Sequence, residues 1–216
     1  MESEKTGLST RDVIIQGCEE LFYEKGYKET KFSLLSEKTG KPKSLINYYF
    51  PVKADLVKEL VNRLMEQIAD LIDEHVEDNP IIKQLVFNHV FYQVANRDQQ
   101  TGTFIAEVLS RDERVLKLGD FFELFYYPLV ETEGLDEAHN FGRKVFIYGC
   151  ALELLKNYFM GIDRMNWQEI IVEINRLNLI MIGIPTIEMD KYLDASMDAV
   201  NQIDYSELRL LNVKKD

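Results

Sequence analysis

The stretch that decides the fold covers residues 26–50 and reads GYKETKFSLLSEKTGKPKSLINYYF. Two short helices are expected in it, over about residues 31–39 and 43–49, and Gly40 ends the first of them. Two short helices joined at a glycine form a helix-turn-helix, in which the first helix crosses the DNA backbone and the second enters the major groove. The same spacing also fits a plain helical hairpin within a bundle, so spacing alone leaves both interpretations open.

The second of these helices has the side chains that a DNA-reading helix needs. Its apolar residues, which would anchor it to a core, are Leu45, Ile46 and Phe50. Its other positions offer hydrogen-bonding groups that can reach base edges and phosphates. They are Lys43, Ser44, Asn47, Tyr48 and Tyr49.

With its flanks, the stretch resembles the head of the tetracycline-repressor (TetR) family of transcription regulators over about residues 10–60. That head has a first helix ending in Phe-x-x-x-Gly, then a threonine, an apolar pair and a glycine turn. An aromatic-ended recognition helix follows, and a lysine and a leucine open a long helix. Here these positions are Phe22, Gly26, Thr30, Leu34, Leu35, Gly40, Tyr48, Tyr49, Phe50, Lys53 and Leu56. Because spacing and residue type agree over the whole run, the head is favoured over the hairpin.

The resemblance implies a role for each matching residue of the recognition helix. Base-edge and nearby phosphate contacts are made in the family at the positions of Lys43, Ser44 and Asn47. Contacts to phosphate or to thymine methyl groups are made at the aromatic positions of Tyr48 and Tyr49. The recognition helix is therefore expected to read the operator.

Further positions are implied to hold the DNA backbone. Lys53 matches a phosphate-clamping lysine at the start of the fourth helix. Thr30, Lys31 and Ser33 lie at the start of the second helix, where amides and hydroxyls bind phosphates, and Thr30 is expected to cap that helix.

Three residues depart from the family pattern. Ser36 replaces a small alanine, and Pro42 replaces the serine or threonine that usually opens the recognition helix, so it supplies no capping oxygen. Asn47 stands where a phosphate-binding tyrosine is usual, and an asparagine can instead read adenine. These departures bear on the operator sequence more than on the act of binding.

Charge is distributed unevenly along the chain. The net charge is −12, yet residues 1–55 hold nine basic and nine acidic residues, so the later residues carry the whole deficit. Within residues 28–53, six lysines stand against two glutamates. Such a basic patch can meet phosphates on an acidic protein, because the field near a contact matters more than the total charge.

Helical periodicity continues through almost the whole chain, which has only five prolines and eleven glycines and no convincing strand pattern. We therefore expect an all-α fold. A three-helix helix-turn-helix head would occupy residues 1–55, and a larger helical effector-binding and dimerisation domain would occupy residues 56–216. The first helix is predicted over about residues 10–25, with Gly26 as its stop. The body helices are predicted over about residues 52–76, 79–96, 101–110, 112–131, 136–160, 166–182 and 187–201.

Apolar stripes on the last two long helices offer a dimer interface, which is also where the resemblance places it. The candidate residues are Tyr148, Leu152, Leu155, Phe159, Ile174, Leu177 and Met181. The alternative is that both stripes belong to the internal core. A helix-turn-helix that reads a palindrome needs a two-fold partner, which favours the homodimer.

An effector pocket is implied by the resemblance, and residues 85–95 are apolar nearly all round, as in a central buried helix. The candidate ligand residues are Asn88, His89, Tyr92, Phe125, Tyr126 and Glu153. Such a lining would suit a small apolar or aromatic effector. The alternatives are that the aromatic residues are plain core, that His89 is a hydrogen-bonded core residue, and that Glu153 faces solvent.

Several classes of protein are not supported. The sequence has no apolar run long enough for a membrane span, no signal peptide, no metal-ligand spacing and no catalytic motif. Cys18 and Cys150, both in apolar patterns, suggest buried thiols in a reducing compartment. A cytoplasmic protein that is not an enzyme, with no metal, cofactor or membrane partner, is expected.

The sequence thus predicts a sequence-specific DNA-binding transcription regulator. Its partner would be a palindromic double-stranded operator, bound by a homodimer that acts as a repressor and is released by a small molecule. One alternative is a TetR-like regulator controlled by a protein or peptide partner, or an activator. Another is a helical protein-interaction module without operator binding.

Overall fold

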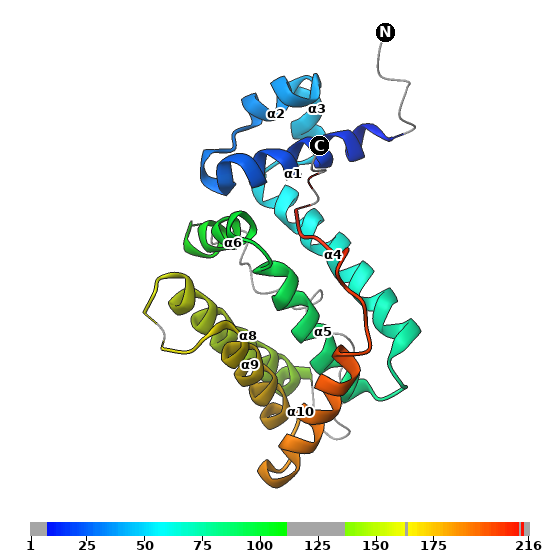
Figure 1. Cartoon of the computed structure of the whole chain (residues 1–216). Coiled ribbons are helices and arrows are strands. Elements are labelled where there is room, and N and C mark those ends of the chain that lie inside the picture. The colour runs from blue at the N-terminus through cyan, green and yellow to red at the C-terminus, as the bar shows by residue number, and fades with distance from the viewer. Residues whose placement is uncertain (1–7, 112–136, 163, 212, 214–216) are drawn as a thin grey trace.

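The computed structural model describes residues 8–111, 137–162, 164–211 and 213. Within them the chain folds into helices joined by short connections, without a strand (Figure 1). The helices are α1 (Thr10–Glu29), α2 (Phe32–Thr39), α3 (Lys43–Tyr49), α4 (Lys53–His75), α5 (Pro80–Ala95), α6 (Gln99–Arg111), α8 (Glu137–Phe159), α9 (Trp167–Met181) and α10 (Thr186–Val200). The all-α prediction is confirmed.

Glycines interrupt the helices of the head where the sequence predicted. The backbone of α1 leaves helical geometry at Gly26, with φ 77° and ψ 173°, and α2 ends at Gly40 in the left-handed conformation, with φ 65°. Thr30 was expected to cap α2, but that prediction is wrong. Lys31 is the N-cap residue, and the buried Thr30 hydroxyl donates backwards, 2.8 Å from the Gly26 carbonyl oxygen.

The centre of the body is α5, which is buried on nearly every side as predicted. Asn79 caps it, accepting hydrogen bonds from the amides of Ile81 and Ile82, and Pro80 opens it. A buried polar ladder joins α5 to α9. Asn88 donates to Asn175 Oδ1 at 3.0 Å, and Asn175 donates to the Leu85 carbonyl oxygen at 3.1 Å.

The head rests on the body through α6, which lies beneath α1 in Figure 1. The Phe104 ring of α6 is fully buried, with its centroid 4.8 Å from that of Phe22 and 6.3 Å from that of Tyr27. Since these aromatic residues share one hydrophobic cluster, the position of α6 bears directly on the position of the head.

The remaining predictions concern the helix after α6, the two cysteines and membrane spans. The helix predicted over residues 112–131 lies outside the described residues, as do Phe125 and Tyr126. Both cysteines are free thiols; Cys18 is buried and Cys150 is half-buried. In the described part of the chain, no helix is both long enough and apolar enough to cross a membrane.

Candidate nucleic-acid interface and interior cavity

The recognition helix α3 is divided into an anchored side and an outward side. Ile46 and Phe50 are 0% and 2% exposed and join the main core. The predicted reading residues, Lys43, Ser44, Asn47, Tyr48 and Tyr49, are all exposed, and Tyr48 reaches 79%. A helix fixed by one side and polar on the other can enter a groove without losing its support.

Hydrogen bonds in the turn before α3 set its direction. The Ser36 hydroxyl donates to the Lys41 carbonyl oxygen at 2.7 Å, and the Thr39 hydroxyl donates to the Leu35 carbonyl oxygen at 2.6 Å. No side chain caps α3, as expected from Pro42. The serine that departs from the family pattern thus stabilises the turn between the two helices.

The residues at the start of α2 that were predicted to contact the DNA backbone differ in their exposure to solvent. Lys31 and Ser33 are exposed and lie beside the first amides of α2. Thr30 is 1% exposed, and its hydroxyl donates within the head. Its predicted contact with a phosphate does not agree with this burial, so Thr30 is a structural residue.

The side chain of Lys53 binds backbone carbonyl oxygens within the head. Its Nζ donates to the carbonyl oxygens of Tyr27 at 2.6 Å and Thr30 at 3.0 Å, and it lies 4.1 Å from the centroid of the Tyr27 ring. Carbonyls at the end of a helix attract cations. Lys53 therefore joins the end of α1 to the start of α4, a structural role that the resemblance did not imply.

We expect Lys53→Ala to lower the free energy of unfolding by about 2 kcal/mol, because two charge-assisted hydrogen bonds and a cation–π contact are lost. Urea unfolding followed by circular dichroism measures this change. Lys31→Ala removes an exposed lysine from the same end of the head, and it should change the unfolding free energy by less than about 0.5 kcal/mol. An unchanged unfolding midpoint in Lys53→Ala would contradict the structural role.

Glu107 of α6 also reaches the end of α1, a contact that sequence reasoning missed. Its carboxylate accepts a hydrogen bond from the Lys28 amide at 2.8 Å, and it lies against Gly26. Nothing in the sequence marks this pair, because the donor is a backbone amide far away along the chain. We call residues 26–30 the head junction, since Thr30, Lys53 and Glu107 all bind there.

An apolar cavity of about 60 Å³ lies between α4, α5, α6, α8 and the start of α9. Tyr92, one of the predicted ligand residues, lines it together with Val57, Ile105, Leu155 and Trp167. The Trp167 indole Nε1 is buried without a hydrogen-bond partner among the described residues. Trp167 is the chain's single tryptophan, so its fluorescence can report on this cavity.

The other described ligand candidates lie elsewhere. Both ends of the Asn88 amide are engaged, one with Gln84 at 2.8 Å and the other with Asn175. His89 is a buried residue, and burial lowers the pKa of its imidazole, which is therefore neutral at pH 7. Glu153 is exposed on α8. None of these three residues lines the interior cavity, so their role as ligand contacts stays a prediction.

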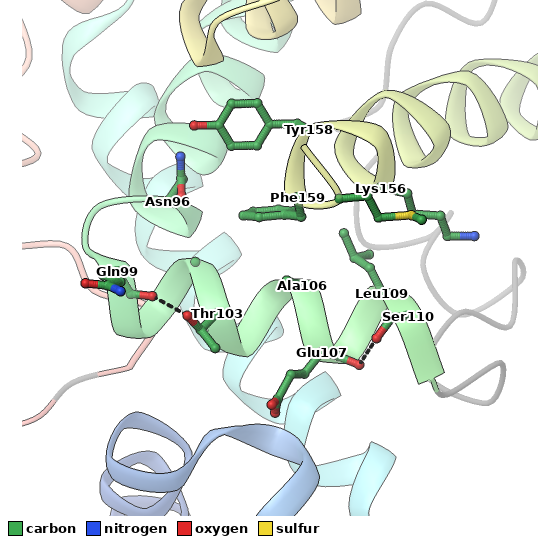
Figure 2. A pocket seen from close by; sticks show the side chains of 12 residues that line it. Asn96, Gln99, Thr103, Ala106, Glu107, Leu109, Ser110, Lys156, Tyr158 and Phe159 are labelled. Atoms are coloured by element: carbon green, nitrogen blue, oxygen red, sulfur yellow. Dashed lines mark hydrogen bonds between the residues drawn. The ribbon is translucent and has the colours of Figure 1, made fainter. Parts of the chain in front are cut away.

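A wider cleft of about 920 Å³ opens between α6 and the end of α8 (Figure 2). Its lining is polar along part of α6 and at Lys156, and apolar at Phe159 and Leu109. Leu109 lines both the cleft and the interior cavity. Figure 2 shows Glu107 pointing away from the cleft toward the head.

Several of the predicted dimer residues turn inward. Leu152 and Leu155 line the cavity, Phe159 lines the cleft, and Ile174 is 2% exposed within the protomer's own core. Ile174 is therefore a core residue of the protomer, whereas Leu152, Leu155 and Phe159 are half-buried and their part in an interface stays a prediction. Leu177 and Met181 are partly exposed, and the side chain of Tyr148 lies outside the described residues.

Comparisons with known proteins agree with this architecture. The sequence profile of the family described as "Bacterial regulatory proteins, tetR family" matches residues 14–60. A TetR transcriptional regulator from Rhodococcus sp. RHA1 is similar in structure, with a TM-score of 0.57 and 12% identity over 79% of this chain and 94% of that chain. The transcriptional regulator FadR from Bacillus subtilis, in complex with stearoyl-CoA, gives a TM-score of 0.51 and 17% identity over 81% of this chain and 99% of that chain. No curated protein matches the sequence.

An anchored, outward-facing recognition helix at one end of an all-helical body defines a DNA-binding helix-turn-helix regulator. The family profile matches this head, and the similar solved structures share the fold of most of the chain. Residues 14–60 therefore form a head of the TetR type of bacterial regulatory proteins.

Proposed function

We propose that this regulator is a ligand-responsive repressor that binds a palindromic operator as a homodimer. The observation that carries the proposal is the exposed face of α3, where Asn47 and Tyr48 stand outward while Ile46 and Phe50 hold the helix. In this proposal residues 1–55 are the DNA-binding head and residues 56–216 bind the effector and the partner protomer.

The head's contacts divide into reading and positioning. Lys43 and Asn47 lie on the exposed face that would meet base edges, where lysine suits guanine and asparagine suits adenine. Lys31 and Ser33, exposed at the start of α2, suit phosphates. The proposed DNA-binding surface also includes Ser44, Tyr48 and Tyr49, which are exposed on α3.

We expect Asn47→Ala, and separately Lys43→Ala, to weaken operator binding by about 1–3 kcal/mol and to relax the preference at one base position per half-site. Fluorescence anisotropy with the chain's own upstream region, and with single-base variants of the bound site, measures both effects. Lys191→Ala, an exposed lysine on α10, is the matched control and should bind as the unmodified protein does. If no DNA from the upstream region binds with preference, the helical interaction module replaces this proposal.

The outward face of α8 is the proposed centre of the dimer. Gly142, Phe146, Gly149 and Glu153 are exposed at alternating spacings of four and three, and Phe146 is 54% exposed. A Cβ added at either glycine would meet no atom within 4 Å of the described residues. A large exposed aromatic ring between two glycines suits the close approach of a second helix. Leu177 and Met181 of α9 continue the proposed interface.

The proposed effector is a slender apolar molecule with one or two polar groups. The interior cavity offers apolar walls, and the adjoining cleft offers Lys156 to a polar end. Because FadR from Bacillus subtilis is seen with stearoyl-CoA, an acyl chain is the first probe. The net charge of −12 disfavours a polyanionic head group, so we propose the single carboxylate of stearate.

We expect stearate to change the fluorescence of Trp167 and to weaken operator binding by about tenfold, a typical coupling between two sites. Coenzyme A without an acyl chain should do neither. Ala151→Leu narrows the cavity and should abolish the fluorescence change, whereas Ala195→Leu on the exposed side of α10 should not. If stearate alters the fluorescence but leaves operator affinity unchanged, the effector mechanism is wrong and control by a partner is favoured.

Ligand binding would act on DNA through α6. A ligand that widens the cavity moves Ile105 and Leu109, and the same helix carries Glu107, which is bound to the head junction. Two heads of a dimer must fit major-groove half-sites about 34 Å apart. A ligand that binds better to the displaced arrangement therefore lowers the operator-competent population.

A further inference from the structure

Beyond α10, residues 201–211 form a non-helical segment that returns toward the head (Figure 1), and we call it the carboxy-terminal strap. Ile203, Leu210 and Leu211 are only 6%, 2% and 2% exposed, and all three belong to the main hydrophobic cluster. A segment without helical hydrogen bonds keeps such burial only if the rest of the molecule holds it. The strap is therefore a packed element of the fold.

Arg97 fastens the strap to the corner between α5 and α6. Its Nη2 donates to the Tyr205 carbonyl oxygen at 2.8 Å, and its Nη1 donates to the Ser206 carbonyl oxygen. The guanidinium carbon lies 5.9 Å from the centroid of the Tyr205 ring. An arginine fork can span two consecutive carbonyls, whereas the point charge of a lysine cannot reproduce that geometry.

Hydrogen bonds within the strap hold the turn whose carbonyl oxygens Arg97 binds. The Ser206 amide donates to Asp204 Oδ1 at 2.9 Å, which closes a tight turn around Tyr205. Arg209 also donates to the Ser206 carbonyl oxygen, and to that of Leu208 at 2.8 Å. Arg209 belongs to the strap, so its contacts stabilise the turn but do not join the strap to anything else.

The corner held by Arg97 is the start of α6. Asp98, the next residue, accepts hydrogen bonds from the Thr101 amide through its side chain at 2.8 Å and from the Gly102 amide through its carbonyl oxygen at 2.9 Å. Farther along α6, Phe104 packs on α1 and Glu107 binds the head junction. The contacts thus run without a gap from the strap to Arg97, along α6 and into the head.

We propose that the carboxy-terminal strap is a positioning device that fixes the start of α6 and so sets the place of the head on the body. Release of the strap frees α6, and the head then moves on the body without any ligand. This role is independent of the effector and of the operator, because it depends only on contacts within one protomer.

Hydrogen–deuterium exchange on the full chain tests the proposal, with Arg97→Lys as the variant and Arg209→Gln as the matched control. In Arg97→Lys we expect exchange about tenfold faster in peptides covering α6 and the head junction, with residues 60–72 of α4 unchanged. In Arg209→Gln the faster exchange should stay within residues 201–211. Faster exchange confined to the strap in both variants would overturn the proposal.

A milder second variant covers the case in which Arg97→Lys loosens the whole protein. Tyr205→Leu removes the ring beside the guanidinium but keeps an apolar side chain and both carbonyls. Faster exchange in α6, with α4 and α5 unchanged, supports the positioning role. A uniform increase over all helices, or none in α6, shows that the strap contributes only to general stability, and the proposal then fails.

Discussion

Gly26→Ala should lower the free energy of unfolding by about 3–5 kcal/mol. Gly26 has φ 77° and ψ 173°, a region open almost only to glycine, and an alanine forced into it costs about 1–3 kcal/mol. The added Cβ would also lie 2.6 Å from Glu107 Oε2. Displacing that carboxylate breaks its hydrogen bond to the Lys28 amide, which is worth about 1.5–3 kcal/mol.

Urea unfolding followed by circular dichroism measures this loss, and Gly40→Ala is the control. Gly40 also has a positive φ, 65°, but a Cβ there would meet nothing within 4 Å. We expect its cost to be about 1–2 kcal/mol, from the left-handed backbone alone. In a protein that already carries Glu107→Ala, Gly26→Ala should lower the free energy of unfolding by less, because the added Cβ no longer meets the Glu107 carboxylate. If Gly26→Ala and Gly40→Ala lower the free energy of unfolding by the same amount, the role of Glu107 at the head junction is disproved.

Phe146→Glu should convert the proposed dimer to a folded monomer and reduce operator affinity. Phe146 is a large apolar residue that is 54% exposed on α8, between Gly142 and Gly149. A carboxylate buried at the centre of a two-fold interface meets its own copy, so we expect the dimer dissociation constant to rise by about a hundredfold or more. A monomer reads one half-site and loses the second set of contacts.

Sedimentation velocity distinguishes a species of 25.3 kDa from one of twice that mass, and circular dichroism verifies that the helices persist. Ile187→Glu is the matched control, because Ile187 is 92% exposed on α10 and lies outside the proposed interface. It should remain a dimer. A folded Phe146→Glu dimer would show that the interface lies on another face, and a monomer in the unmodified protein would remove the dimer from the proposal.

The helices and their ends were predictable because their signals are local. The recognition helix was predicted over residues 43–49 and is α3, Lys43–Tyr49. Gly40 and the pair Asn79–Pro80 mark helix ends through backbone preferences that no tertiary contact has to supply. The division of α3 into anchoring and exposed residues followed from helical periodicity in the same way.

The candidate sites were predicted less well, because they depend on which side of a helix meets which neighbour. Leu152 and Leu155 lie on the most apolar side of α8, and that side proved to face the cavity. Asn88 looked like a polar group available to a ligand, but a partner on α9 engages it. A periodic pattern identifies an apolar face without saying whether the protomer or its partner covers it.

The sequence by itself determined the all-α fold, the helix-turn-helix and the exposed face of α3, because these follow from spacing and backbone preference within short segments. Only the tertiary structure decided that Lys53 binds the carbonyls of the head junction, that Glu107 reaches the Lys28 amide, and that Arg97 holds the strap. In all three contacts a charged side chain meets a backbone group distant along the chain. Every residue carries the same amide and carbonyl, so the sequence does not mark the partner, and packing alone selects it.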